Sequence, residues 1–266
     1  MTTLNTPRIS ILTTVYNREK YLAECIESVQ NGHFQDYEHI IVDDRSSDGS
    51  VALAQSYAAK DARIRVYQNE TNLGDYPNRN QAASYARGKY LKYLDADDLI
   101  YPWGLQILWE FMERFPEAGW GLCSLAQDQS RPFPFVLNTR EAYRYHYLGP
   151  GLFHKAPLSS IIKKELFEAV GGFEPTRMVG DYEMWHRLAL HAPVVCMTGG
   201  IAWYREHDEQ EFNSAHLFKK QYSSIKKKYL AAPDNGLSEK DLNDIQKRDR
   251  RNKIKSFGLK IIGFLK

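Results

Sequence analysis

Three carboxylates within four positions follow an aromatic and aliphatic run near the middle of the chain. The run at 90–94 is typical of a buried strand, and Asp95, Asp97 and Asp98 come directly after it. Folding alone does not favour this ending, because clustered like charges repel one another. Crowded carboxylates are hard oxygen ligands that suit Mg²⁺ or Mn²⁺, including an ion that also binds a phosphate group. Capping of the next helix is the alternative, but three acids behind one strand favour a metal.

The elements that would position these acids alternate between strand and helix. Strands are expected at 8–15, 39–42, 64–67 and 90–94, and helices at 19–29, 51–59 and 81–86. This order predicts an α/β fold with a mostly parallel, doubly wound sheet flanked by helices, which binds ligands outside the carboxyl ends of its strands. The polar residues expected to share one site at these ends are Asn17, Asp43, Asp44, Asp95 and Asp97.

A nucleotide is the expected ligand of this strand edge. The chain has neither GxGxxG after the first strand nor GxxxxGK[ST], which excludes the dinucleotide fingerprint and the P-loop. A base could instead stack on Tyr16, while a metal ion on the 95–98 cluster bridges the diphosphate. Arg79, expected on the loop before the third helix, could place a positive charge beside the phosphates or contact the base.

A second group of polar residues lies in the other half of the chain. Asp181 is expected at the start of a helix whose buried face includes Met184, Trp185 and Leu188. An acid at this position usually caps its helix. Before it, residues 127–157 are rich in proline, glycine and aromatic residues, which predicts an irregular loop that could bind a sugar. The alternative is that these aromatic residues only pack against the sheet.

Four motifs, in this order and spacing, resemble those of the family 2 glycosyltransferases, which are inverting, nucleotide-sugar-dependent enzymes of the GT-A fold. The motifs are TTVYN at 13–17, VDDRSSD at 42–48, NLG at 72–74 with Arg79 and Asn80, and DADD at 95–98. The resemblance covers about residues 8–207. It implies a GT-A fold that binds a nucleoside-diphosphate sugar, with UDP-sugars as the favoured donors.

The resemblance also implies roles for individual residues. Thr14, Tyr16 and Asp44 would line the base site, Asp95 would lie near the ribose, and Asp97 would hold Mn²⁺ or Mg²⁺. The full donor-binding set would be Thr14, Tyr16, Asn17, Asp43, Asp44, Arg79, Asp95 and Ala96. The metal ligands would be Asp97, Asp95 and His207, with Asp98 as an alternative because the register of DADD is open by one residue.

The same resemblance assigns the catalytic base. In this family an acidic pair opens the helix after a GGF turn, and its Asp takes the proton of the acceptor hydroxyl. Here the pair is Gly180 and Asp181, which keeps the Asp but lacks the preceding Glu, while Glu183 lies further into the helix. Asp181 is therefore the expected base of an inverting transfer, with a metal ion stabilising the departing diphosphate.

Length and composition agree with one α/β domain and a small appendage. The chain has 266 residues, of which 43% are hydrophobic, and no apolar run reaches the roughly 18 residues of a membrane span. Cys25, Cys123 and Cys196 are widely spaced among apolar residues and are expected to be reduced core thiols. With no signal peptide visible, the expected location is cytoplasmic.

The expected domain boundary falls near residue 212. A catalytic domain would cover 1–212, with a nucleotide-sugar-binding half at about 8–100 and an acceptor-binding half at about 101–212. A helical C-terminal extension with a basic amphipathic tail would cover 213–266.

The end of this extension is strongly basic. Residues 247–266 contain eight Lys or Arg and one acid, a charge of +7, so a chain of net charge +2 leaves −5 for residues 1–246. The apolar residues that would share one helix face there are Ile254, Phe257, Ile261 and Leu265. This pattern predicts peripheral attachment to an anionic membrane at its inner face through 250–266, or docking of the helix on the catalytic domain or on a second subunit. No nucleic-acid-binding motif accompanies the tail, so no nucleic acid is expected as a partner.

The sequence as a whole predicts an inverting glycosyltransferase that moves a sugar from a nucleoside diphosphate to a glycan or lipid-linked acceptor, in cell-surface polysaccharide biosynthesis. One alternative is a noncatalytic nucleotide-sugar-binding subunit of a glycan-assembly complex. The other is a sugar-nucleotide pyrophosphorylase, which would require a Gly- and Arg-rich loop right after the first strand, where this chain has TTVYNREK.

Overall fold

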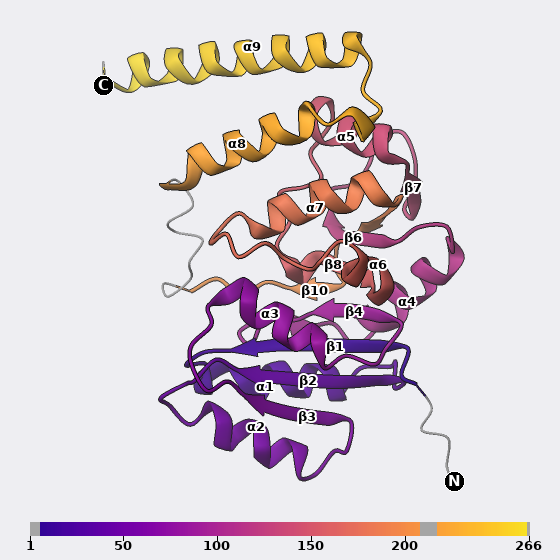
Figure 1. Cartoon of the computed structure of the whole chain (residues 1–266), viewed down its shortest axis with the longest axis vertical. Helices are drawn as coiled ribbons and strands as arrows, with labels where there is room; N and C mark the ends of the chain where they lie inside the picture. The colour runs from indigo at the N-terminus through magenta and orange to yellow at the C-terminus, as the bar shows by residue number, and fades with distance from the viewer. Residues whose placement is uncertain (1–5, 208–216, 265–266) are drawn as a thin grey trace.

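The computed structural model describes residues 6–207 and 217–264, and side chains as far as residue 252. An eight-stranded sheet runs through both halves of the chain in the order β3-β2-β1-β4-β8-β6-β9-β7 (Figure 1). Its strands are β1 (Ile9–Val15), β2 (Tyr37–Asp43), β3 (Ile64–Gln68), β4 (Tyr90–Tyr93), β6 (Trp120–Leu125), β7 (Phe135–Leu137), β8 (Ser160–Lys163) and β9 (Val194–Thr198). β7 and β8 run antiparallel to their neighbours and the other pairs of this sheet are parallel, which confirms the mostly parallel α/β sheet.

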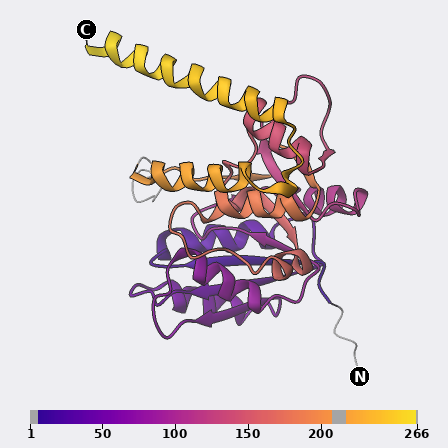
Figure 2. The ribbon, with the colours of Figure 1, turned by 45° about the horizontal axis from the view of Figure 1, so that its top comes forward.

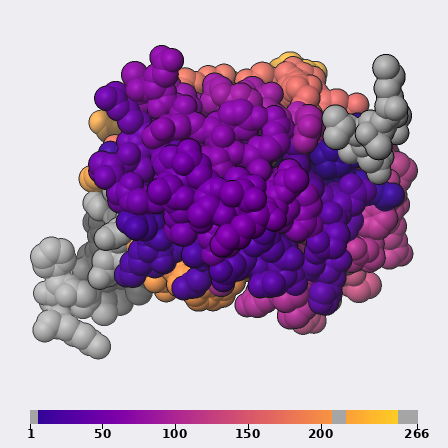
Figure 3. Space-filling model, turned by 90° about the horizontal axis from the view of Figure 1, so that it is seen from below, coloured from indigo at the N-terminus to yellow at the C-terminus, as the bar shows by residue number. Residues whose placement is uncertain are grey.

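Helices cover both faces of the sheet, because each strand face is too apolar to meet water. One face packs against α1 (Glu19–Gln30), α2 (Ser50–Ala58) and α4 (Gly104–Arg114). The other packs against α3 (Asp75–Ser84), α5 (Thr139–Leu148), α6 (Lys164–Ala169) and α7 (Gly180–His191). Cys25, Cys123 and Cys196 are free and buried, as expected. Seen from below, the surface is built mainly by the N-terminal half of the chain (Figure 3).

The third helix begins earlier than its sequence pattern indicates. α3 starts at Asp75 rather than at residue 81, so the prediction that Arg79 lies on a loop is wrong. The chain turns at Gly74, whose φ is +83°, a value that favours glycine. Pro77 then falls in the first helical turn, where backbone N–H groups have no partner within the helix, so the lack of an N–H in proline costs no helical hydrogen bond. This earlier start places the Arg79 side chain inside the protein, 7% exposed.

The segment at 127–157 is more regular than expected, since it contains β7 and α5. A capping box begins α5: the Glu141 N–H donates to Oδ1 of Asn138, and the Asn138 N–H donates to Oε2 of Glu141, both at 3.0 Å. Tyr143 and Tyr147 of this helix are buried in the core. At these two positions the packing interpretation holds.

A separate two-stranded sheet sits above the strand ends, formed by β5 (Leu99–Ile100) and β10 (Ala202–Trp203). It ties the segment after β9 to the segment after β4, since Trp203 pairs with Leu99. The last described residues before 208 therefore lie next to the acidic loop that follows β4.

The C-terminal extension is helical, as expected. α8 (Lys219–Leu230) packs on α7, where the Tyr229 hydroxyl donates to the Glu183 carboxylate, and α9 (Glu239–Phe264) follows the short 3-10 helix η3 (Pro233–Asn235). Figure 2 shows α9 extending beyond the rest of the ribbon. Within the described part of the chain, no helix has the length and apolar content needed to cross a membrane. The apolar face expected after residue 253 lies outside the described side chains and stays a prediction.

Candidate active site

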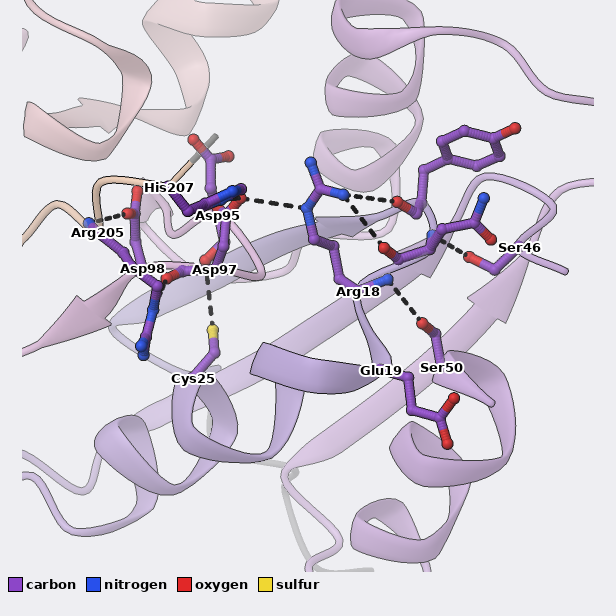
Figure 4. A network of polar contacts seen from close by, with 12 residues as sticks. Arg18, Glu19, Cys25, Ser46, Ser50, Asp95, Asp97, Asp98, Arg205 and His207 are labelled. Carbon is purple, nitrogen blue, oxygen red and sulfur yellow. Dashed lines mark hydrogen bonds and ion pairs between the residues drawn. The ribbon is translucent and has the colours of Figure 1, made fainter. Parts of the chain in front are cut away.

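The carboxyl ends of β1, β2 and β4 meet at one edge of the sheet. β1 and β2 are parallel with Val15 beside Asp43, and β1 and β4 are parallel with Leu12 beside Tyr93. The loops that follow these strands therefore share this edge, as expected. Figure 4 shows the part of the edge around the acidic loop at 95–98.

Asp97 lies between a guanidinium and an imidazole. Its Oδ2 atom is 3.1 Å from Nε of Arg18 and 3.0 Å from Nε2 of His207 (Figure 4). The His207 ring also stacks on Tyr21 of α1, with centroids 5.0 Å apart, and this contact holds the imidazole beside the carboxylate. The structure thus brings together two of the expected metal ligands, Asp97 and His207.

Asp95, the third expected ligand, has a different partner. Its Oδ1 atom is 2.6 Å from Nη1 of Arg79, whose Nε donates to Asp75 at 2.7 Å. The Arg79 guanidinium therefore neutralises two acids from inside the protein in this structure, and its expected contact with a donor stays a prediction. The neighbouring Ala96 is 2% exposed and packs in the core, so its backbone rather than its methyl group would face a donor.

Asp98 is the most deeply buried of the three acids. Its Oδ1 atom accepts a hydrogen bond from the Arg205 N–H at 2.9 Å, and its Oδ2 atom has no hydrogen-bond partner among the described residues. Burial, followed by the charges of Asp95 and Asp97, raises the pKa of Asp98 to about 8. Burial and the neighbouring acids thus favour the protonated form of Asp98.

The Asp97 and His207 pair fits a divalent cation in its chemistry. A carboxylate oxygen and an imidazole nitrogen 3.0 Å apart are suitable ligands for Mn²⁺, and both are partly shielded from water. Among residues 6–207 and 217–252, no group of three or more His, Cys, Asp or Glu side chains is arranged to hold a metal ion. A bound ion would therefore need oxygen atoms from a substrate or from water to complete its coordination.

The two acids after β2 shape the neighbouring loops. Asp44 accepts from the backbone N–H groups of Leu73 at 2.8 Å and Gly74 at 2.9 Å, so it fixes the NLG loop beside β2. Asp43 accepts from the Ser46 N–H at 2.9 Å, while its Oδ1 atom is buried without a hydrogen-bond partner among the described residues. One buried acceptor at this edge is thus unpaired among the described residues.

The residues after β1 lie on the same edge and are more open. Thr14 is half-buried, while the Tyr16 side chain is 51% exposed, as a stacking platform for a base would need. Asn17 has a φ of +53° and its Oδ1 accepts from the Ser47 N–H at 2.8 Å, which links the first two loops. A hollow of about 360 Å³ opens here and is lined by Asn17, Glu19, Lys20, Tyr21 and Asp48.

Asp181 is the second residue of α7 and lies close to this edge, next to Asp75 and Arg79. Burial, with the charge of Asp75, raises the pKa of Asp181 to about 7, against hydrogen bonds from the Tyr182 N–H and the Tyr76 hydroxyl that lower it. The Tyr182 N–H donates to its Oδ1 at 2.6 Å. A carboxyl group with this pKa can accept a proton near neutral pH.

Packing explains why a glycine, Gly180, precedes Asp181. A Cβ atom on Gly180 would lie 2.7 Å from the ring of Tyr76, which is too close for any side chain unless Tyr76 moves. The Tyr76 hydroxyl in turn accepts from the Asp181 N–H at 3.1 Å. Tyr76 therefore occupies the space beside the acid that a Glu at position 180 would need.

Glu183 does not share this position. Its carboxylate is buried, lies 2.8 Å from Nη2 of Arg187, and accepts a hydrogen bond from the Tyr229 hydroxyl of α8. Arg187 also donates to the carbonyl oxygen of Gly172, in the turn between α6 and α7. Glu183 therefore links α7 to α8. Of the two acids in the first turn of α7, it is Glu183 that pairs with Arg187.

Sequence analysis missed two cationic residues at the edge, Arg18 and Arg205. Arg18 contacts Asp97, and Arg205 donates from Nε to the Asp97 carbonyl oxygen at 2.8 Å and from its backbone to Asp98. Each lies next to a residue that the sequence had already indicated, Arg18 after Asn17 and Arg205 two positions before His207. Positive side chains next to an acidic cluster were the signal that could have identified them.

The chain is similar to known glycosyltransferases. The sequence model described as Glycosyl transferase family 2 matches residues 10–171. Glycosyltransferase GlyG of Streptococcus pneumoniae is 27% identical over 212 residues, which covers 74% of this chain and 70% of that protein. An uncharacterised glycosyltransferase of Methanocaldococcus jannaschii is 40% identical over 112 residues, 41% of this chain and 39% of that protein. The chain thus matches about two-fifths of the length of this archaeal relative.

Solved structures share the fold at low sequence identity. TarS of S. aureus, in complex with UDP-GlcNAc, superposes with a TM-score of 0.70 at 21% identity and covers 90% of this chain and 70% of that one. The mannosyltransferase PcManGT of Pyrobaculum calidifontis, in complex with GDP-Man and Mn²⁺, gives a TM-score of 0.64 at 16% identity and covers 91% and 68%. These similarities show a GT-A fold.

Proposed function

The chain belongs to glycosyl transferase family 2, whose sequence model matches more than half of it, and we propose that it transfers a sugar from a nucleoside diphosphate to a glycan or lipid-linked acceptor. One observation carries this proposal. A carboxyl group whose pKa is about 7, that of Asp181, lies on the same sheet edge as the acidic loop that holds Asp97 beside His207. Asp75 and Arg79 connect the two, since Arg79 pairs with Asp95.

The donor would lie along the loops after β1, β2 and β4. Tyr16 is exposed enough to stack on a base, and Thr14 lies two residues before it, on β1. Asp43, at the end of β2, would accept from the base or the ribose. Asn17 and Asp44 fix the loops around this space. Because TarS is described with UDP-GlcNAc and PcManGT with GDP-Man, we propose a nucleotide sugar as the donor, with UDP-sugars first.

Asp97 and His207, with oxygen atoms of the donor diphosphate, would hold Mn²⁺ or Mg²⁺, which would neutralise the charge of the departing diphosphate. Asp95, paired with Arg79 here, would face the ribose. The Mn²⁺ reported with PcManGT supports this assignment for a related fold.

Asp181 would act as general base. Its carboxylate would take the proton of the acceptor hydroxyl while that oxygen attacks the anomeric carbon, and the bond to the diphosphate oxygen would break on the opposite face. One attack from the face opposite the leaving group inverts the anomeric centre. The Tyr182 N–H and Tyr76 hold the carboxylate in place for this step.

The biological setting that we propose is the assembly of cell-surface polysaccharide in the cytoplasm, at the inner face of the membrane. TuaG of Bacillus subtilis, named for teichuronic acid biosynthesis, is 36% identical over 143 residues, 52% of this chain and 56% of that protein. The charge of +7 on residues 247–266 supports attachment to an anionic surface.

A thermal-shift panel tests the donor site. UDP-, GDP-, dTDP- and CDP-sugars are added with and without Mn²⁺ to the wild type and to Asp97→Ala. A ligand of the folded state raises Tm with its concentration, so one nucleotide sugar should stabilise the wild type in the presence of Mn²⁺, and Asp97→Ala should lose that effect. If no nucleotide sugar shifts the wild type under either condition, the proposal fails.

A further inference from the structure

Each acid of the 95–98 loop contacts a different protein group. Asp95 pairs with Arg79, Asp98 is buried and accepts from the Arg205 N–H, and Asp97 pairs with Arg18 as well as with His207. Arg79 is buried and also pairs with Asp75, so it is held beside Asp95 from inside the protein. The Arg18 side chain is 25% exposed, so it can turn from Asp97 toward water without becoming a buried unpaired charge.

Arg18 reaches Asp97 from the loop that joins β1 to α1. It precedes α1, where its N–H donates to Oγ of Ser50 at 3.0 Å. Its Nη1 donates to the carbonyl oxygens of Asn17 at 3.1 Å and Tyr16 at 3.4 Å, while its Nε faces Asp97 (Figure 4). These carbonyl groups belong to the loop after β1, so a rotation of the guanidinium away from Asp97 leaves it above the same edge.

We propose that Arg18 is a displaceable counter-ion, which pairs with Asp97 in the metal-free protein and with the diphosphate of the donor in the loaded protein. This inference rests on the proposed donor site. Its physical basis is charge. A guanidinium beside Asp97 repels a divalent cation held by Asp97 and His207, whereas a diphosphate offers the same guanidinium two oxygen atoms in a matching bidentate geometry.

Such an exchange couples the two ligands. Binding of Mn²⁺ alone has to separate Arg18 from Asp97 without giving it another anion, so it is weakened in the wild type. A nucleoside diphosphate supplies that anion, so it strengthens Mn²⁺ binding, and by linkage Mn²⁺ strengthens nucleotide binding by the same factor. Without Arg18, the affinity for Mn²⁺ alone rises and the coupling falls.

Isothermal titration of Mn²⁺, in the absence and presence of UDP and of GDP, measures both quantities for the full chain. Arg18→Gln should bind Mn²⁺ alone about tenfold more tightly than the wild type. The factor by which the better nucleotide tightens Mn²⁺ binding should fall about tenfold in the same variant. Arg8→Gln is the matched control, because it removes the same charge at the opposite end of β1, where Arg8 pairs with the exposed Asp36. It should leave both quantities unchanged.

The possible failures are distinguishable. If Arg18→Gln keeps the wild-type affinity and coupling, or if Arg8→Gln changes them equally, the role of Arg18 is overturned while the donor site stands. If the wild type binds no Mn²⁺ with either nucleotide, the donor site and the inference fail together. Asp97→Asn, which should lose Mn²⁺ binding, shows that the titration reports this site.

Discussion

Asp181, the base that we propose, is a buried carboxyl group. Burial raises its pKa to about 7, which makes it a better base than an exposed carboxylate at neutral pH. The hydroxyl of Tyr76 and the Tyr182 N–H stabilise the charged form and keep the pKa from rising further. The pKa of Asp181 is therefore set by its neighbours, and substitution of a neighbour should change it.

Tyr76→Phe should shift the pH dependence of the transfer. Since Asp181 must be deprotonated to act, kcat/KM should rise with pH through about 7 in the wild type. Loss of the Tyr76 hydroxyl removes a hydrogen bond to the charged form, so the midpoint should move to higher pH, by about half a unit to one unit. Tyr143→Phe, which removes a buried hydroxyl bound to the His186 carbonyl, is the control with an unchanged midpoint. An equal midpoint in Tyr76→Phe would contradict this role.

Asp181→Asn should stabilise the protein above neutral pH. The folded pKa of Asp181 is raised above its unfolded value of about 4, so its contribution to stability is full below pH 4 and is lost as pH rises through about 7. An amide keeps the oxygen that accepts from Tyr182 and carries no charge. A rise of about three pKa units corresponds to about 4 kcal/mol, so the gain at pH 8 should be on the order of a few kcal/mol, and it should vanish at pH 4. Thermal melts at both pH values measure it, and an equal gain at both would argue against a charge effect.

At the scale of elements, the acidic strand ends could be predicted because burial and charge alternate along the sequence. The aromatic and aliphatic run before Asp95 and the β-branched run before Asp43 both indicate a strand that ends at an acid. α3 could not be placed correctly from its apolar pattern, because its start carries Asp75, Pro77 and Asn78, which do not continue that pattern. Arg79 is the clearest case. Its charge indicates an exposed position in the sequence, and its burial follows from its ion pairs with Asp75 and Asp95.

The start of α5 shows a signal that was present and overlooked. Asn138 and Glu141 have the spacing of a capping box, and a turn-rich composition around them concealed it. Contacts between Arg18 and Asp97 belong to another class, since 79 positions separate them. Such pairs depend on which strands become neighbours in the sheet, so a local sequence pattern does not predict them.

The N-terminus of α9 offers a test of how the extension is anchored. Asp241 is 1% exposed and accepts from Arg140 at 2.8 Å, from Arg144, and from the Ser238 N–H at 3.0 Å. Asp241→Asn leaves two arginines without their carboxylate, so it should cost about 2–3 kcal/mol locally. Limited proteolysis should then cleave α9 faster, with UDP binding unchanged.

Asp244→Asn is the matched control for this change. Asp244 lies one turn further along α9 and pairs only loosely with Lys247, at 3.8 Å. Its substitution should leave the proteolysis rate at the wild-type value. Equal protection of α9 in Asp241→Asn would show that this cluster does not anchor the extension.

At the scale of the whole molecule, charge is divided between an acidic body and a basic end. The +7 on residues 247–266 predicts salt-dependent attachment to anionic vesicles, because exposed charges lose their attraction as ionic strength rises. The chain should sediment with phosphatidylglycerol vesicles in low salt and not with phosphatidylcholine vesicles. A chain ending at residue 246 should lose this attachment; if it sediments equally, the tail is not the attachment site.

We propose that the strand edge binds a metal-dependent sugar donor and that Asp181 is the base of the transfer. The most direct measurement is release of nucleoside diphosphate from the stabilising nucleotide sugar, in the presence of Mn²⁺, by the wild type and by Asp181→Asn, with donor affinity measured on the same samples. We expect Asp181→Asn to bind the donor as the wild type does and to release product about 10²- to 10⁴-fold more slowly. If Asp181→Asn releases product at the wild-type rate, Asp181 is not the base and the account of this site is wrong.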